Sequence, residues 1–142
     1  MSTLTVGIVD YGVGNLTSVY RALHSMGYRC RVSRQFEVLS ETDLLLLPGV
    51  GAFPAAMQAL HECNLVEYLQ EQARQERPVV GICLGMQLLA DASTEYRLTA
   101  GLGLIPGQVT ALPNARWHTG WNTIEVLDRD ALLQPSDGQS LY

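Results

Sequence analysis

Apolar residues in the first ninety positions follow two alternating patterns. Short apolar runs rich in valine, leucine and isoleucine occupy residues 4–9, 43–47 and 78–82, which is typical of strands. Residues 29–33 alternate between polar and apolar positions, which also suggests a strand. Between them, apolar residues recur every three or four positions and predict helices over 16–26, 54–60, 65–73 and 84–90. Strands that alternate with helices predict an α/β domain with a doubly wound, mostly parallel sheet.

Two features of this pattern carry further expectations. The runs 43–47 and 78–82 are almost purely apolar, which favours strands buried on both faces. Gly27 stands where a helix would end, and Asn64 followed by Glu67 resembles a capping pair that opens a helix. After residue 100 we expect shorter antiparallel strands over 108–112 and 123–127. The chain contains no repeat or linker, so we predict one domain over residues 1–142, with an antiparallel extension.

Charge and composition exclude several classes of protein. The net charge is −5 and all nine basic residues are arginines, with Arg29, Arg31 and Arg34 forming the densest group. We interpret this group as a solvated edge, and the acidic balance disfavours a nucleic-acid binder. No apolar run is long enough to span a membrane, and residues 1–5 do not resemble a signal peptide. We therefore expect a cytoplasmic protein.

The chain has three cysteines, Cys30, Cys63 and Cys83, without CxxC spacing. This pattern predicts reduced thiols rather than a disulfide framework or a metal site. Cys83 lies in Gly-Ile-Cys-Leu-Gly, where a predicted strand gives way to a predicted helix. Such an elbow exposes a nucleophile on a sharp turn and places it at a helix N-terminus, which favours thiolate. The alternative is a buried structural cysteine, which we expect for Cys30 and Cys63.

Two neighbouring features fit a thiol nucleophile. Gln87 lies one helical turn after Cys83, where its carboxamide can bind a small polar substrate. Residues 48–51, Pro-Gly-Val-Gly, follow another predicted strand, and ligands of doubly wound sheets bind beyond the carboxyl ends of the strands. The backbone N–H groups of this loop and of Leu84 can form an oxyanion hole, although by itself the loop is more typical of a plain turn.

With these residues in place, the chain resembles the class I, or triad, glutamine amidotransferases. The motif over 81–87, GICLGMQ, resembles the nucleophile motif of that family. The segments DYGVGNL (10–16), LPGVGAF (47–53), GLGLI (101–105) and GWN (120–122) are most similar to the glutaminase subunits of imidazole glycerol phosphate synthases. The resemblance implies a flavodoxin-like fold, C-terminally incomplete in this chain.

The resemblance also implies a chemistry. Cys83 would attack the side-chain amide of glutamine, form a glutamyl thioester and release ammonia and glutamate without a metal or cofactor. The ammonia would pass to a partner (β/α)₈-barrel synthase subunit that forms imidazole glycerol phosphate in histidine biosynthesis.

Site residues carry over at matching positions. By resemblance, Val50, Gly51 and Leu84 would form the oxyanion hole, and Gly49, Gln87 and Glu95 would bind glutamine. Partner-facing residues would be Asn15, His118, Trp121 and Asn122. For Glu95 the alternative is an exposed loop carboxylate, and for Trp121 a core or rim aromatic.

The chain departs from the family in two places. The catalytic base of the family is a histidine, backed by a glutamate, well after the Gly-Trp-Asn motif, and no histidine follows His118 here. None of His24, His61 and His118 has the pattern of a catalytic partner, so we expect little glutaminase activity from this chain alone. Without the C-terminal segment of the family, we also expect an unprotected sheet edge. Trp117 also replaces a proline usual in the family.

Three other functions stay open. One is an amidotransferase of another pathway, such as surface-polysaccharide amidation, which would share the glutaminase chemistry and differ only in its partner. The second is a truncated, non-catalytic paralogue that docks a partner. The third is a cysteine hydrolase or chaperone with a similar elbow. Gln87 and the loop over residues 11–15 speak against the last of these.

Overall fold

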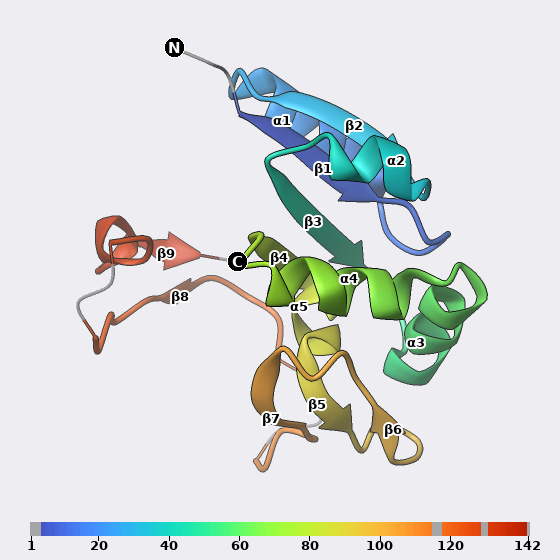
Figure 1. Cartoon of the computed structure of the whole chain (residues 1–142). Coiled ribbons are helices and arrows are strands. Elements are labelled where there is room, and N and C mark those ends of the chain that lie inside the picture. Colours follow the sequence, from blue (N-terminus) through green and yellow to red (C-terminus); the bar gives the residue numbers. More distant parts are fainter. Residues whose placement is uncertain (1–3, 115–117, 129–130, 142) are drawn as a thin grey trace. The chain divides into compact units, whose positions relative to one another are not determined.

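The computed structural model describes residues 4–114, 118–128 and 131–141. These residues form two compact units, one up to Thr110 and one from Ala111 on, which are described separately. Figure 1 shows the elements of both units.

The first unit is built on a four-stranded parallel sheet with the order β2-β1-β3-β4. The strands are β1 (Thr5–Val9), β2 (Arg29–Ser33), β3 (Leu44–Gly49) and β4 (Val79–Cys83). The helices are α1 (Leu16–Ser25), α2 (Phe36–Ser40), α3 (Phe53–Glu62), α4 (Leu65–Arg74) and α5 (Leu84–Leu88). The predicted doubly wound α/β fold is confirmed, and the short helix α2 is an element that the sequence pattern did not predict.

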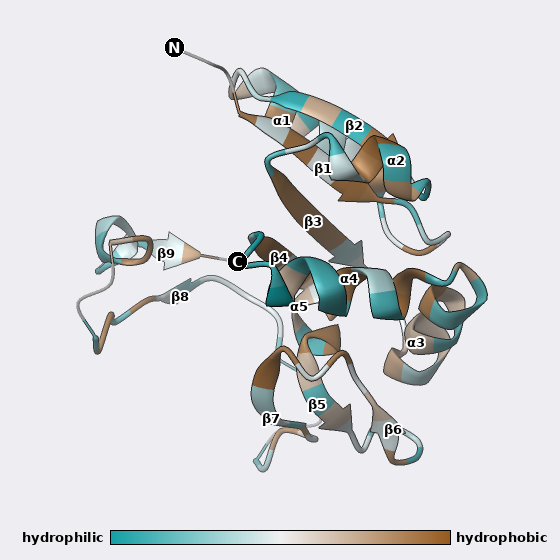
Figure 2. Ribbon diagram, in the orientation of Figure 1, coloured by the Kyte–Doolittle hydropathy of each residue, from teal (hydrophilic) through white to brown (hydrophobic). Residues whose placement is uncertain are grey.

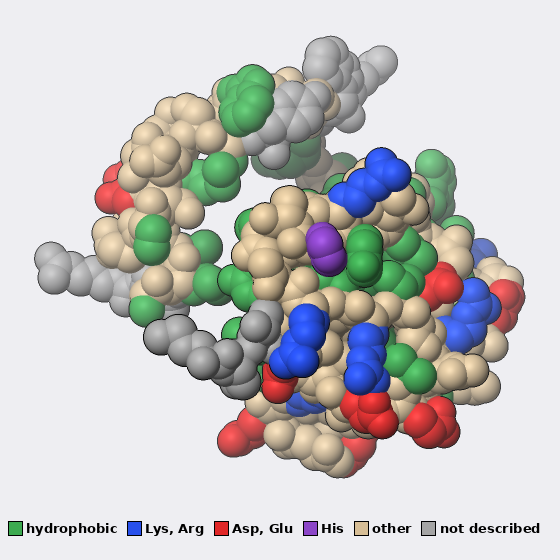
Figure 3. Space-filling model, turned by 90° about the horizontal axis from the view of Figure 1, so that it is seen from above, with side chains coloured by type: hydrophobic (Ala, Val, Ile, Leu, Met, Phe, Trp, Pro, Cys, Tyr) green, Lys and Arg blue, Asp and Glu red, His purple; other side chains and the backbone are tan. Residues whose placement is uncertain are grey.

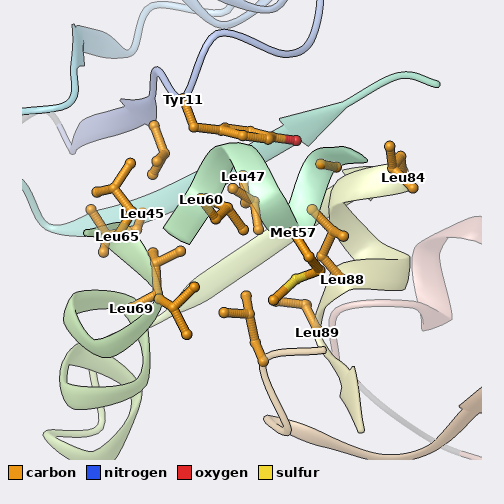
Figure 4. Close-up of a cluster of buried hydrophobic side chains, with 14 of the residues drawn as sticks. Tyr11, Leu45, Leu47, Met57, Leu60, Leu65, Leu69, Leu84, Leu88 and Leu89 are labelled. Atoms are coloured by element: carbon orange, nitrogen blue, oxygen red, sulfur yellow. The ribbon is translucent and has the colours of Figure 1, made fainter. Parts of the chain in front are cut away.

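Helices cover the two faces of this sheet unequally. Helix α1 and helix α2 lie on opposite sides of β1 and β2 (Figure 1). Under α1, a small core contains Val6, Ile8 and Leu46. On the other face, a larger core joins β3 to α2, α3, α4 and α5 (Figure 4). Strand β3, which Figure 2 shows as hydrophobic along most of its length, contributes to both cores, as predicted for a strand buried on both faces.

Strand β4 is not buried on both faces, so that prediction was wrong. It lies at the end of the sheet, and its side chains Val80 and Ile82 are 43% and 44% exposed. They stand in register with Leu46 and Pro48 of β3. An apolar run predicts a strand but not the number of its neighbours, and β4 has only one among the described residues.

The predicted capping role of Asn64 was also wrong. Asn64 has the left-handed conformation, with φ 56°, and its side chain makes no capping hydrogen bond to α4. Its N–H instead donates to His61 O at 3.0 Å, which closes the end of α3. Gly27 ends α1 as predicted. Its φ is 87°, and its N–H donates a hydrogen bond to His24 O at 3.0 Å.

A second, mixed sheet begins directly after α5. It contains β5 (Ala90–Ser93), β6 (Thr99–Ala100) and β7 (Ile105–Val109) in the order β6-β5-β7, with β5 antiparallel to β6 but parallel to β7. Helix α5 ends earlier than predicted because the N–H groups of Leu102 and Leu104 bond to the carbonyls of Leu88 and Leu89. The expected extension therefore starts ten residues earlier and is not purely antiparallel.

The second unit contains a short antiparallel pair, β8 (Asn122–Thr123) and β9 (Ser140–Leu141), and a 3₁₀ turn, η1 (Gln134–Ser136). The predicted strand over 123–127 is thus shorter than expected. The N–H of Val126 donates a hydrogen bond to the Asp137 carboxylate at 3.0 Å instead of to a strand partner. Across the described residues of both units, no helix is long and apolar enough to cross a membrane.

Candidate functional site

Cys83 lies at a sharp turn between β4 and α5. It is the last residue of the strand and the N-cap of the helix, with φ 56° and ψ −121°. A residue with a side chain rarely adopts this backbone conformation, and such strain persists only where the surrounding structure enforces it. The thiol-bearing residue is exposed. The strand–turn–helix setting predicted for the elbow is confirmed.

Close packing around the turn explains its glycines. A Cβ built on Gly85 would lie 1.8 Å from Leu47 O, and one built on Gly81 would lie 2.4 Å from Met86 Cα. Both contacts involve backbone atoms, which cannot move aside as a flexible side chain does. The two glycines therefore let the start of α5 pack directly on β3 and on β4, which holds Cys83 at the surface.

The loop after β3 lies beside this elbow. Gly49, the last residue of β3, is in register with Cys83 in β4. A Cβ on Gly49 would meet Gly85 N at 2.7 Å and Leu84 Cβ at 3.0 Å. Val50 and Gly51 follow at the surface, with Gly51 at φ 92°. The structure thus brings together all three predicted oxyanion-hole residues, Val50, Gly51 and Leu84, around the end of β4.

The two predicted glutamine-contacting side chains differ in their surroundings. Gln87 is half-buried in α5, one turn after Cys83, and its carboxamide makes no hydrogen bond within the described part of the chain. The carboxylate of Glu95, in the turn between β5 and β6, accepts a hydrogen bond from Phe53 N at 2.8 Å. Glu95 is therefore attached to the first residue of α3, directly after the Gly49–Gly51 loop. A surface hollow of about 400 Å³ lies along this junction, lined by the first turns of α3 and by Tyr96 and Arg97.

Tyr11 belongs to the same region, although the sequence analysis gave it no role. It lies two residues after β1, is 2% exposed, and donates its hydroxyl hydrogen to Pro48 O at 2.7 Å. Figure 4 shows its ring across the large core, with the hydroxyl directed to the side where Leu84 lies. Burial raises the pKa of the Tyr11 hydroxyl to about 12, so it remains a donor at neutral pH. Its place at the carboxyl end of β1 is a signal that could have identified it.

The residues predicted to face a partner are spread over both units. Asn15 is the N-cap of α1, and its side-chain oxygen accepts from Ser18 N at 3.2 Å. In the second unit, the Asn122 side chain lies 2.7 Å from His118 Nε2, and Trp121 is 72% exposed. Trp117, which departs from the family pattern, lies outside the described residues.

The two histidines of the first unit lie away from Cys83. His24, in the last turn of α1, lines a surface hollow together with Thr5 and Arg29, the first residues of β1 and β2. Cys83 is the last residue of its strand, so His24 lies toward the opposite, amino-terminal ends of the parallel strands. His61 lies in the last turn of α3, about 12 Å along the helix from its first residue. Neither is placed to accept the thiol proton.

The two other cysteines lie against the hydrophobic cores, as expected of structural residues. Cys30 and Cys63 are partly buried against the small and large cores respectively, and burial raises the pKa of Cys30. No group of His, Cys, Asp and Glu suited to holding a metal ion occurs among the described residues. On the face in Figure 3, arginine side chains are interspersed with acidic ones, and Arg31 and Arg34 of the predicted solvated edge pair with Glu41 and Asp10.

Comparison with known proteins gives a consistent result. Residues 7–133 match the family model described as glutamine amidotransferase class-I. The chain is 41% identical over 139 residues to the "Imidazole glycerol phosphate synthase subunit HisH" of Listeria monocytogenes serotype 4a, covering 95% of this chain and 67% of the relative. It is 47% identical over 122 residues to the protein of the same name from Exiguobacterium sibiricum, covering 84% and 62%. The chain thus spans about two thirds of the length of these relatives.

A solved structure described as "Crystal structure of glutamine amidotransferase" has a similar fold. Its TM-score is 0.64 at 21% sequence identity, over 75% of this chain and 56% of the solved one. At this identity the likeness supports the fold and not the chemistry.

Proposed function

Because this chain belongs to the class I glutamine amidotransferase family, we propose that it forms the glutamine-binding and nucleophilic part of a glutaminase. The observation that carries the proposal is the register of Gly49 with Cys83. It places an exposed thiol next to the surface loop of Val50 and Gly51, whose N–H groups donate no backbone hydrogen bond within the described chain. Acyl-transfer enzymes require this combination of nucleophile and oxyanion donors.

The proposed reaction proceeds through a thioester. The Cys83 sulfur bonds to the carboxamide carbon of glutamine, and the thiol proton is transferred so that the nitrogen leaves as ammonia. Water then adds to the thioester carbon, the carbon–sulfur bond breaks, and glutamate leaves as the thiol is restored. The negative charge that develops on the oxygen in both steps would be held by the N–H groups of Leu84 and of Val50 or Gly51.

Two side chains would orient the substrate. Gln87 projects from the helix that begins at Cys83, and its carboxamide has no partner among the described residues. Glu95 supplies a carboxylate that can pair with the α-ammonium group of glutamine, and Gly49 would line the site between them. Glu95 is therefore proposed as the residue that selects an amino acid over a simple amide.

The ammonia would be used by a second subunit. Relatives from several bacteria are named as a subunit of imidazole glycerol phosphate synthase, which supports a synthase partner and a role in histidine biosynthesis. We propose that this partner is a (β/α)₈-barrel subunit, that the complex is cytoplasmic, and that Asn15, His118, Trp121 and Asn122 face it. Co-purification of a barrel synthase subunit with the wild-type chain, weakened by Trp121→Ala, would support this assignment. Equal recovery with both chains would contradict it.

A chloroketone analogue of glutamine tests the glutaminase proposal directly. The Cys83 sulfur bonds to the chloromethyl carbon, chloride leaves, and the thiol proton passes to solvent. We expect saturable labelling of Cys83 that L-glutamine suppresses and that Cys83→Ser abolishes, as measured by peptide mass spectrometry. Equal labelling of Cys30, Cys63 and Cys83, without protection by glutamine, would show that the elbow is not a glutamine site.

A further inference from the structure

The segment from Gly49 to Ala52 connects β3 to α3 and carries the proposed oxyanion donors. Val50 is 55% exposed and Gly51 has a positive φ of 92°. Within the described chain, neither of their N–H groups donates a backbone hydrogen bond. No backbone hydrogen bond from Val50 or Gly51 thus holds the middle of the segment in place. Its geometry depends on how its two ends are fixed.

A buried hydroxyl fixes the strand end. Tyr11 Oη donates to Pro48 O at 2.7 Å, in the residue just before Gly49. The same hydroxyl would lie 2.9 Å from a Cβ on Gly49, so it contacts the backbone at the point where the segment leaves β3. The ring is fully enclosed in the large core, which leaves the hydroxyl little freedom to move.

A carboxylate from a distant turn fixes the helix end. The N-cap of α3 is Ala52, which has no side chain that can cap, so the first N–H of α3 lacks a local partner. Glu95 Oε2, 42 residues away in the sequence, accepts that N–H at 2.8 Å. The backbone of Glu95 is itself held, because its N–H donates to the buried Ser93 Oγ at 3.1 Å and its carbonyl accepts from Arg97 N at 2.7 Å.

We propose that Tyr11 and Glu95 are positioning residues that clamp the two ends of the Gly49–Ala52 segment, and that Glu95 links recognition of the substrate's ammonium group to the placement of the oxyanion donors. Glu95 can do both because a carboxylate has two oxygens. Oε2 holds the Phe53 N–H, and Oε1 accepts no hydrogen bond from the described residues and is available to an ammonium group. The inference rests on the proposed function for its substrate, but the clamp itself is a property of the fold.

Substitutions separate the two roles of Glu95. Glu95→Gln keeps an oxygen that can accept from Phe53 N–H but removes the charge, whereas Glu95→Ala removes both. Tyr11→Phe removes only the hydroxyl. Matched controls are Glu67→Ala, at an exposed carboxylate in α4, and Tyr20→Phe, at a half-exposed ring that stacks on His24. Far-UV circular dichroism checks that each variant is folded.

Hydrogen exchange tests the clamp without any substrate. In the 142-residue chain, Glu95→Ala and Tyr11→Phe should accelerate exchange of the hydrogen-bonded amides at the start of α3, Phe53 and Ala56, by about tenfold, which corresponds to one lost hydrogen bond. Glu95→Gln and both controls should exchange like the wild type. Unchanged exchange in Glu95→Ala and Tyr11→Phe would overturn the clamp. Equal acceleration by Glu67→Ala would overturn it too, since the effect would then be general.

Labelling of Cys83 tests the link to the substrate. For the glutamine chloroketone, Glu95→Gln should raise the half-saturating concentration about tenfold, and Tyr11→Phe should lower the maximal rate while the half-saturating concentration stays the same. Iodoacetamide, which needs no ammonium or oxyanion site, should react with all variants at the wild-type rate. A uniform loss of both reactions would mean that the substitutions only disrupt the fold, and would contradict positioning.

The two proposals fail differently in these experiments. If the wild type shows the expected exchange pattern but no saturable chloroketone labelling, the glutaminase proposal and the link to the substrate are wrong, while the clamp stands. If labelling is saturable but Glu95→Ala and Tyr11→Phe leave exchange and labelling unchanged, the clamp is wrong and the glutaminase proposal stands.

Discussion

At the scale of single residues, Gly85 decides whether the elbow can form. Its Cβ position overlaps the carbonyl oxygen of Leu47, a backbone atom in the middle of the sheet. We predict that Gly85→Ala lowers the free energy of unfolding in urea by about 3 kcal/mol, because α5 must move away from β3. Gly27→Ala is the matched control. A Cβ there meets open space, and only the positive φ costs stability, about 1 kcal/mol. Equal losses in the two variants would argue against close packing as the cause.

Tyr11 predicts a specific alkaline dependence of stability. Its pKa is about 12 in the folded chain against 10.0 for an ordinary tyrosine, because burial disfavours the ionised form. Below about pH 10 both states keep the proton, so the residue causes no pH dependence there. Between about pH 10 and 12 only the unfolded chain releases it, and the free energy of unfolding falls as pH rises.

The size of this loss is bounded at about 2.7 kcal/mol, since one pKa unit corresponds to about 1.36 kcal/mol. The chain contains no lysine, so no lysine ammonium group titrates in the same range. Urea unfolding at about pH 9 and pH 11 should show a steeper decrease for the wild type than for Tyr11→Phe. Parallel decreases for the two chains would show that the hydroxyl is not buried as described.

At the scale of elements, the two edges of the parallel sheet differ in protection. Strand β2 carries Arg29 and Arg31, and charged side chains disfavour pairing of an edge with another chain. Strand β4 has the sequence Val-Val-Gly-Ile-Cys, without a charge, and exposes Val80 and Ile82. The β4 edge is therefore the less protected of the two, whereas the sequence analysis expected an unprotected edge without identifying the strand that forms it.

We predict that the 142-residue chain self-associates through β4. Sedimentation velocity over a range of concentrations should show oligomers for the wild type and mainly monomer for Ile82→Lys, because the charge must be buried when edges pair. Val32→Lys on β2 is the matched control, at a residue of similar exposure, and should behave like the wild type. A wild-type chain that stays monomeric, or an equal effect of both variants, would contradict this prediction.

The elements also show how far the sequence could be interpreted. Periodicity predicts the four strands, the longer helices and the Cys83 elbow, because each depends on residues close in sequence. It does not predict that β4 lies at an edge, since that depends on which strands pair. It also misses the contact of Glu95 with Phe53, because a helix cap supplied from 42 residues away leaves no local pattern. The Tyr11 hydroxyl is missed for the same reason.

At the scale of the whole molecule, the described histidines of the first unit lie away from the nucleophile. The first unit places Cys83, the oxyanion donors and Gln87 around the end of β4. Among its described residues, His24 lies toward the amino-terminal ends of the strands, away from Cys83, and His61 lies in the last turn of α3. A positioned base typically accelerates proton transfer by about 10²–10⁴-fold. An elbow without one can still be alkylated, because a strong electrophile reacts with a cysteine nucleophile without a positioned general base.

We therefore predict that these 142 residues alkylate at Cys83 but release glutamate from glutamine no faster than the Cys83→Ser variant. A coupled glutamate dehydrogenase assay at saturating glutamine, run on the same preparation as the chloroketone labelling, measures both. Steady glutamate release above the Cys83→Ser background would contradict the prediction and would require a base within the chain. His118→Ala would then identify its source. Loss of turnover in that variant would assign the base to the second unit, and unchanged turnover would show that the base is a group other than His118.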